Sequence, residues 1–130
     1  MQLIESSLLN SVSDRAKESP RLRMNHNFHY SPEAPVQRLL NALEPGTVIP
    51  VHRHRHTDET YILLRGCIRA IFYDEEGTEL ESAVINPAQG CFGIQIPAWQ
   101  WHSLEVISPG TVIFEVKEGP YVPLGPEDLL

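Results

Sequence analysis

The sequence has few cysteines, few basic residues and no long hydrophobic run. Its 130 residues include two cysteines, Cys67 and Cys91, which do not form a CxxC pair, so nothing requires disulfides or an oxidising compartment. Ten Lys and Arg stand against 17 Asp and Glu, a net charge of −7 that argues against nucleic acid or an anionic membrane as a partner. No apolar run approaches the roughly 20 residues that span a bilayer.

The length of the chain predicts one domain, large enough to bury a core without disulfides or a structural metal. Eleven prolines and eight glycines, with few long helical patterns, favour a β-rich fold. We expect an N-terminal helix and polar extended segment over residues 1–35, a barrel over 36–118 and a tail over 119–130. The first residues lack a basic region followed by an apolar block, so we expect no secretory signal and a cytoplasmic protein.

Residues 5–19 have the apolar spacing of a short amphipathic helix, which Pro20 ends. The residues that recur at intervals of three and four are Leu8, Leu9, Val12 and Ala16. We expect this helix to pack on the outside of the barrel. The alternative that stays open is packing against a second subunit, in a homodimer.

Eight short segments with apolar, β-branched or alternating patterns, separated by turns about every ten residues, predict strands. They are residues 36–43, 47–54, 59–64, 67–74, 78–85, 91–96, 101–106 and 111–117. Their number and spacing indicate an all-β jelly roll of two antiparallel sheets, although another small sandwich also fits the strand order.

Two of these segments depart from simple alternation. Residues 59–64 are apolar on both faces, so we expect their outer face to be covered by the second sheet, the helix or a partner. Glu115 and Lys117 interrupt the last strand, where we expect a cross-strand charge pair.

Histidines gather near one predicted strand. His52 and His54 are two residues apart, so on a strand their imidazoles project from the same face. Glu59 begins the next apolar run, and an adjacent antiparallel strand would bring its carboxylate beside them. His102 lies on an otherwise apolar row and is the best third imidazole, whereas we expect His56 at the rim. The set predicts a metal site, with a solvated polar turn as the alternative.

The same stretch carries the spacing of a known motif. Gly46, His52, His54, Glu59 and Gly66 resemble the first signature motif of the cupin superfamily at every fixed position. The resemblance implies a cupin jelly-roll barrel. It also implies the metal ligands His52, His54, Glu59 and His102.

The second cupin motif is matched only in part. Pro97 and His102 have the separation of the motif, but Cys91 and Trp99 stand where it has glycines and Val106 where it has an asparagine. We therefore expect the loop around Trp99 to have a different shape.

More narrowly, three segments resemble the WbuC-like cupin metalloproteins: residues 21–29, 37–43 and 114–121. Members of that group are similar to mannose-phosphate-isomerase-type cupins and are often encoded beside bacterial genes for surface polysaccharide synthesis. The resemblance implies the fold more strongly than a reaction.

A polar segment without acidic residues, 21–29, precedes the barrel. If it is extended, alternate residues share one face, a row of donors suited to an anionic or hydroxyl-rich ligand. A solvated linker is the alternative. The ligand-binding candidates are Arg23, Asn25, Asn27 and His29, with Arg38 and Asn41 of the following strand.

Three imidazoles and one carboxylate suit one divalent ion, Fe, Mn, Ni or Zn, and leave two positions open on an octahedral ion. We consider three functions. The first is metal-assisted isomerisation or epimerisation of a small sugar-derived ligand, with His29 or Tyr61 moving the proton. The second is an Fe(II)-dependent dioxygenase. The third is a non-catalytic ligand-binding metalloprotein, in which tetrahedral zinc would be structural. The polar row favours the first.

Overall fold

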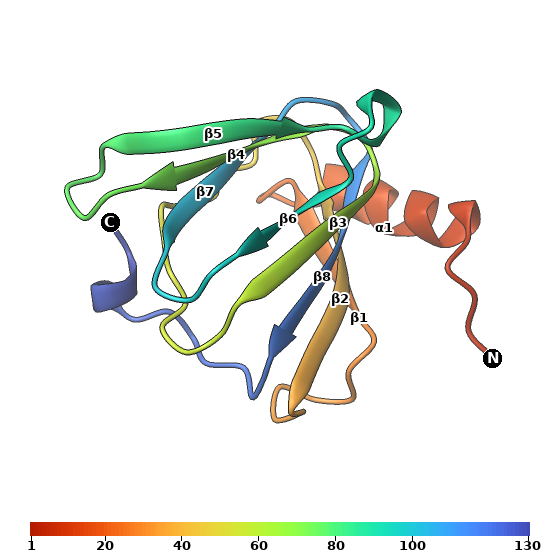
Figure 1. The fold of residues 1–130 in the computed structure, drawn as a ribbon. Coiled ribbons are helices and arrows are strands. Elements are labelled where there is room, and N and C mark those ends of the chain that lie inside the picture. Colours follow the sequence, from red (N-terminus) through yellow and green to blue (C-terminus); the bar gives the residue numbers. More distant parts are fainter.

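Two antiparallel sheets face each other across the core (Figure 1). This computed structural model describes residues 1–130. The larger sheet contains, in spatial order, β1 (Arg23–Asn27), β2 (Val36–Leu43), β8 (Thr111–Glu118), β3 (Glu59–Arg65) and β6 (Gly93–Ile96). The smaller sheet contains β5 (Glu79–Ile85), β4 (Ile68–Tyr73) and β7 (Trp101–Val106). The predicted all-β fold of two antiparallel sheets is confirmed.

One predicted strand is wrong. Residues 47–54 form no strand, and their only ladder contacts are isolated bridges at His52. Pro50 has no backbone N–H to donate to a ladder, which explains why the segment does not join a sheet. The eighth strand is β1, which forms in the polar segment 21–29. The other predicted strands are observed with small differences at their ends.

The main core lies between the sheets. In β3, Tyr61 and Leu63 point inward with Glu59, while Ile62 and Leu64 point outward. Burial of this alternating row removes apolar surface from water, the dominant favourable contribution to folding. The buried residues of this core are Leu43, Tyr61, Leu63, Ile68, Ala70, Ile85, Ile96, Leu104 and Ile113.

Helix α1 (Ser6–Glu18) lies against the outer face of the larger sheet, beside β1 and β2 (Figure 1). Its buried residues Val12 and Ala16 pack on Leu40, Ala42 and Val112. The outward direction of Leu40 and Ala42 places Asn41 on the inner face of β2, which the alternation of the sequence did not decide. None of the helices has both the length and the apolar character needed to cross a bilayer.

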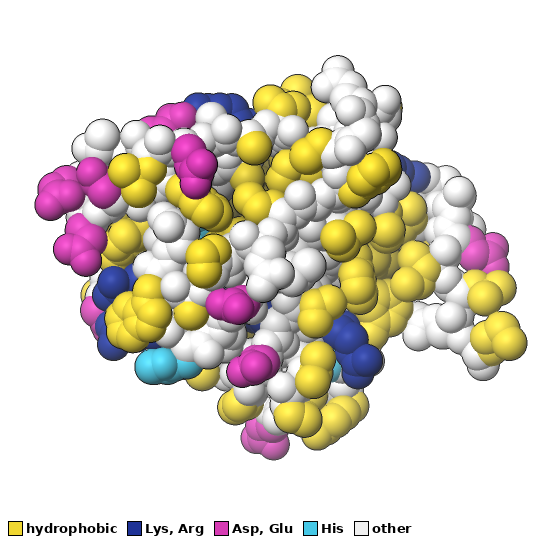
Figure 2. Space-filling model, in the orientation of Figure 1, with side chains coloured by type: hydrophobic (Ala, Val, Ile, Leu, Met, Phe, Trp, Pro, Cys, Tyr) yellow, Lys and Arg dark blue, Asp and Glu magenta, His cyan; other side chains and the backbone are white.

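The helix does not cover the whole outer face. Over β3 and β6, Ile62, Leu64 and Phe92 are exposed, and Figure 2 shows hydrophobic side chains on this side of the molecule. Of the covers expected for residues 59–64, neither the second sheet nor the helix shields these side chains. A partner, such as the second subunit of a homodimer, remains a proposal.

The end of the chain pairs with the segment that carries two predicted metal ligands. The backbone N–H of Leu130 donates to the carbonyl of Val51 at 2.9 Å, and the N–H of Arg53 donates to the carbonyl of Asp128 at 3.1 Å. Asp128 ends the short 3₁₀ helix η2 (Pro126–Asp128). These contacts hold a segment that belongs to no sheet.

Side chains reinforce this pairing. The Asp128 carboxylate accepts hydrogen bonds from Nε of Arg55 at 2.7 Å and from Nε of Arg53 at 3.2 Å. The Arg53 guanidinium carbon also lies 4.4 Å from the centre of the Trp101 ring and 5.1 Å from that of Trp99. Because the arginines alternate with the histidines, these contacts fix the direction in which the imidazoles point.

Gly66 follows β3 with a φ of +93°. A Cβ atom there would lie 2.6 Å from the Cα of Thr111, so a side chain would overlap the backbone of β8. Gly77, in the β4–β5 hairpin, has a similar φ of +83°, but a Cβ atom there would meet nothing within 4 Å. The two glycines therefore share the backbone conformation and differ in the available space.

We expect Gly66→Ala to lower the free energy of unfolding by about 3 kcal/mol or more, because overlap adds to the cost of the left-handed conformation. Gly77→Ala should lower it by only about 1 to 2 kcal/mol. Urea unfolding of both variants measures the difference. Equal losses would contradict the close packing of Gly66 on β8.

We expect Asp128→Ala to weaken binding of a divalent ion at the predicted histidine site by about tenfold, because it releases both arginines that fix the histidine segment. Competition with a chromophoric chelator for Zn²⁺ measures the affinity. Glu127→Ala is the matched control, because this more exposed carboxylate is 3.5 Å from Arg55 and does not contact the Arg53 side chain. Unchanged affinity in Asp128→Ala would show that the tail does not support the site.

Candidate metal centre

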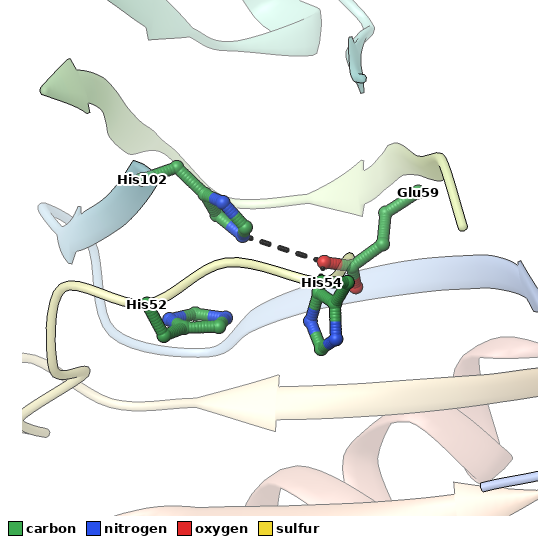
Figure 3. A group of neighbouring side chains, drawn as sticks. All are labelled: His52, His54, Glu59 and His102. Carbon is green, nitrogen blue, oxygen red and sulfur yellow. Dashed lines mark ion pairs between the residues drawn. The ribbon is translucent and has the colours of Figure 1, made fainter. Parts of the chain in front are cut away.

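Four side chains converge between the two sheets (Figure 3). Glu59 begins β3 of the larger sheet, His102 comes from β7 of the smaller sheet, and His52 and His54 come from the segment between β2 and β3. One potential ligand atom from each lies within 4.8 Å of all the others. The structure thus brings the four predicted metal ligands together.

The route by which Glu59 reaches the site differs from the prediction. Its strand pairs with β6 and β8, not with the histidine segment, so the expected adjacent antiparallel strand is wrong. His52 instead pairs with His102: the N–H of His52 donates to the His102 carbonyl at 3.0 Å, and the N–H of His102 donates to the His52 carbonyl at 2.8 Å. This bridge links the irregular segment to the smaller sheet.

Two backbone carbonyls fix the tautomers of His52 and His102. Nδ1 of His52 lies 2.8 Å from the carbonyl oxygen of Pro50, and Nδ1 of His102 lies 2.8 Å from that of Gln100. A carbonyl only accepts hydrogen bonds, so each Nδ1 carries the proton when the ring is neutral. Each Nε2 then offers its lone pair, which is the usual arrangement of a metal-binding histidine.

Nε2 of His102 is a buried acceptor that faces another acceptor. It lies 3.3 Å from Oε1 of Glu59, which also lies 2.8 Å from Nε2 of His54, and the side chains of Glu59 and His102 are only 3% exposed. Two acceptors facing each other away from water are unfavourable unless a proton or a cation lies between them. The donor set of imidazole nitrogens and a carboxylate oxygen suits a divalent transition-metal ion. These residues therefore fit a metal.

The electrostatics of the cluster also favour metal binding. Burial, helped by the neighbouring His102, lowers the pKa of His52 to about 4, so this imidazole is neutral at physiological pH. Burial alone would raise the pKa of Glu59, but His102 and His54 outweigh it and lower the pKa below its usual range. Neutral imidazoles and an ionised carboxylate are the forms that bind metal ions.

Tyr61 lies behind the carboxylate. Its hydroxyl donates a hydrogen bond to Oε2 of Glu59 at 3.2 Å. Burial and the Glu59 charge raise the pKa of Tyr61 well above its usual value, so the hydroxyl keeps its proton. In this arrangement Tyr61 orients the carboxylate and leaves Oε1 directed at the imidazoles.

A cavity of about 550 Å³ opens beside the cluster and is lined by His52, His54 and Glu59. Its other polar residues are Ser19, Arg21, Arg23, Asn25, Asn41, Glu115 and Lys117. Three of the six predicted ligand-binding residues therefore lie beside the candidate metal centre: Arg23, Asn25 and Asn41.

The other three candidates lie elsewhere. Asn27 and His29 line a neighbouring cavity of about 280 Å³, which also includes Asn25. Nδ1 of His29 is within hydrogen-bond distance of the backbone N–H and carbonyl of Arg38, at 3.1 and 3.0 Å. Arg38 itself is exposed and lines neither cavity, because it alternates with inward-facing Gln37 and Leu39.

The sequence reasoning missed Glu115 as a cavity residue. It is 9% exposed, and its neighbours across the sheet are Tyr61 and Leu39, so the expected charge pair is not formed at this residue. The available signal was its position two residues after Ile113, which places a carboxyl group on the inward face of an apolar strand.

Trp99 and His56 lie together beside the arginines of the histidine segment. Trp99, which stands where the second cupin motif has a glycine, has a φ of 71°, in the region that glycine favours. The expectation of a different loop shape is therefore not supported at this residue. His56 is exposed, packs against Trp99 with ring centres 5.9 Å apart, and is outside the group of four.

Comparison with solved structures identifies the fold. TT1209 from Thermus thermophilus is 21% identical, with 91% of this chain and 97% of that chain covered and a TM-score of 0.64. The cupin domain of Cnp3 from Schizosaccharomyces pombe is 11% identical, covers 74% of this chain and 64% of that chain, and has a TM-score of 0.59. These similarities show the cupin fold.

The capsular polysaccharide assembling protein CapF from Staphylococcus aureus is 16% identical over 85% of this chain, with a TM-score of 0.62. This chain covers only 29% of CapF. No curated protein matches the sequence. Residues 4–85, more than half of the chain and including His52, His54 and Glu59, match a family described as a domain of unknown function, DUF6016. The chain therefore belongs to the DUF6016 family and has the cupin fold.

Proposed function

We propose that this protein is a metal-dependent cupin that isomerises or epimerises a small, anionic, sugar-derived molecule. One observation carries the proposal: a single cavity is lined by three of the four residues of the candidate metal cluster, together with the cations Arg21, Arg23 and Lys117 and the amides Asn25 and Asn41. Cations bind a phosphate or carboxylate group, and amides form hydrogen bonds with hydroxyl groups.

Arg23 is the best-placed of these cations. Its Nη1 donates hydrogen bonds to the carbonyl of Val48 at 2.9 Å and to Oγ1 of Thr47 at 3.3 Å. These contacts hold one side of the guanidinium, while the group lines the cavity. Partial burial, and then the nearby Arg21, lower the pKa of Arg23 from its usual value, as expected where positive charges gather without a carboxylate partner. An anionic ligand would relieve this repulsion.

The proposed chemistry uses the candidate metal ligands and the polar side chains that line the same cavity. A divalent ion held by His52, His54, Glu59 and His102 would act as a Lewis acid on a carbonyl group of the ligand. Arg23 would hold the anionic group and Asn25 a hydroxyl, which fixes the carbon skeleton between them. The side chains of Ile49 and Leu104 give the cavity an apolar wall against which the skeleton can lie.

We place the protein in the WbuC-like group and in surface polysaccharide metabolism as part of this proposal. Support comes from the three sequence segments that resemble that group and from the shared fold of CapF, which is described as a capsular polysaccharide assembling protein. Both point to a sugar derivative as the ligand.

The test is proton exchange in D₂O with metal-loaded, untagged protein and a panel of hexose 6-phosphates and nucleotide-linked keto-hexoses. We expect the proton on the carbon next to the carbonyl of at least one compound to be replaced by deuterium, with formation of the isomer or epimer, measured by proton NMR. His52→Ala and Glu59→Gln should lose metal severalfold and lose the exchange, because each removes one ligand of the ion.

His56→Ala is the control and should retain both metal and exchange, since this exposed residue lies outside the cluster. Oxygen consumption without exchange would contradict isomerisation and favour a dioxygenase. Tight metal binding with no turnover of any compound would favour a non-catalytic binding protein. Equal metal loss in all three variants would show that the ligand set is wrong.

A further inference from the structure

Glu115 is a buried acid without a cationic partner. It lies on β8, faces the same cavity as the metal-binding cluster, and forms no ion pair. Its only side-chain hydrogen bond comes from Nδ2 of Asn41, which donates to Oε1 at 3.0 Å. A carboxyl group in this setting is unfavourable to keep charged and has no evident role in stabilising the fold.

The surroundings of Glu115 favour its neutral form at low pH and allow its charged form near neutrality. Burial, followed by the charge of Glu59 on β3, raises the pKa of Glu115 to about 7. The Asn41 hydrogen bond, Lys117 on its own strand and His102 on β7 oppose this shift. Tyr61, its cross-strand neighbour, directs its hydroxyl to Glu59 and so does not neutralise Glu115.

Asn41 has a second, unused hydrogen-bonding atom. Its Oδ1 is buried and has no partner, although its Nδ2 is bonded to Glu115. An amide oxygen accepts hydrogen bonds, so the group that fits there is a donor such as a hydroxyl. Asn41 and Glu115 both line this cavity, so a ligand hydroxyl bound to Oδ1 of Asn41 would lie next to the Glu115 carboxyl group.

We propose that Glu115 is the proton-transfer residue of this cavity and that Asn41 positions it while accepting a hydrogen bond from a ligand hydroxyl. The proposal rests on the proposed isomerase or epimerase function. It adds the group that removes and returns the proton. It also adds a hydrogen-bond acceptor that recognises an α-hydroxycarbonyl compound, which has a hydroxyl on the carbon next to the carbonyl.

The step is balanced within the ligand and one side chain. The Glu115 carboxylate takes the proton from the carbon that bears the hydroxyl. The C–H bond breaks, its electron pair forms a carbon–carbon double bond, and the carbonyl π pair moves to oxygen, giving an enediolate. Return of the proton to the opposite face of the same carbon gives the epimer. Transfer to the neighbouring carbon, with the hydroxyl proton moving to the former carbonyl oxygen, gives the isomer. No oxidant or reductant is needed, and the carboxylate is regenerated.

The two candidates named from the sequence are less suited to this step. Tyr61 already donates its proton to Glu59, and its raised pKa keeps the hydroxyl from acting as a base near neutrality. His29 lines only the neighbouring cavity, whereas Glu115 lines both cavities, and Nδ1 of His29 is engaged by the Arg38 backbone. A general base works best with a pKa near the operating pH, which Glu115 meets.

The test compares Glu115→Gln with the wild type, both loaded with metal, in the D₂O exchange assay with the same hexose 6-phosphate panel. We expect exchange to fall by at least about 100-fold, the usual contribution of a general base, with KM and metal content unchanged. The wild-type rate should fall on acidification, as Glu115 becomes protonated. Asn41→Ala should move this pH profile and raise KM.

A second measurement does not depend on turnover. Carbon-13 NMR of metal-free protein labelled at the glutamate carboxyl carbons should show one carboxyl that titrates near pH 7 in the wild type and is absent in Glu115→Gln. Glu118→Gln is the matched control, because Glu118 is an exposed acid on the same strand, and it should retain the titration and the exchange.

The outcomes separate the two proposals. An active wild type with an equally active Glu115→Gln variant would contradict the role of Glu115 alone, as would a wild type with no carboxyl titrating near neutrality. A wild type that binds metal but exchanges no compound of the panel would contradict the proposed function, and the role of Glu115 with it. Loss of metal in Glu115→Gln would show that the residue supports the metal cluster instead.

Discussion

The candidate site depends on the pair of backbone hydrogen bonds between His52 and His102. Residues 47–54 belong to neither sheet, so these bonds are what ties the segment with two of the imidazoles to β7, which supplies the third. The opposite edge of the segment is held by the tail through Leu130 and Asp128. With both edges fixed, the imidazoles face Glu59, whose position is set independently by the larger sheet. The result is a preorganised group of acceptors that a cation would complete.

Local pattern was enough to predict most of the fold. Strands such as β2 and β7 have clear limits in the sequence, because alternation and the turns that bound them agree. The exceptions arise where tertiary contacts decide. Residues 47–54 look like a strand, but Pro50 removes a donor and the segment makes only isolated bridges, to His102 of β7 and to Leu129 of the tail. The sequence predicts an extended segment over 21–29, with a solvated linker as the alternative, and residues 23–27 form β1 because β2 offers an unpaired edge.

The four candidate metal ligands were predictable from the spacing of the motif. This spacing identified them although the expected pairing of the Glu59 strand with the histidine segment was wrong. The residues that line the cavity were harder to predict from the sequence. Whether Asn41 or Arg38 faced inward depended on which side of β2 the helix would cover, and that is settled by the packing of Leu40 against Val12 and Ala16. Glu115 was missed because a single acid in an apolar strand fits a charge pair as well as a cavity residue. Only its neighbours, Tyr61 and Asn41, separate these cases.

The central claim is that His52, His54, Glu59 and His102 hold one metal ion in the cavity. Anomalous diffraction from crystals of untagged protein, collected on both sides of the absorption edge of the metal found by X-ray fluorescence, tests it most directly. We predict one peak bonded to three imidazole nitrogens and a Glu59 oxygen at about 2.0 to 2.2 Å. Crystals without an anomalous peak among these four side chains, or with the ion bound elsewhere, would contradict it.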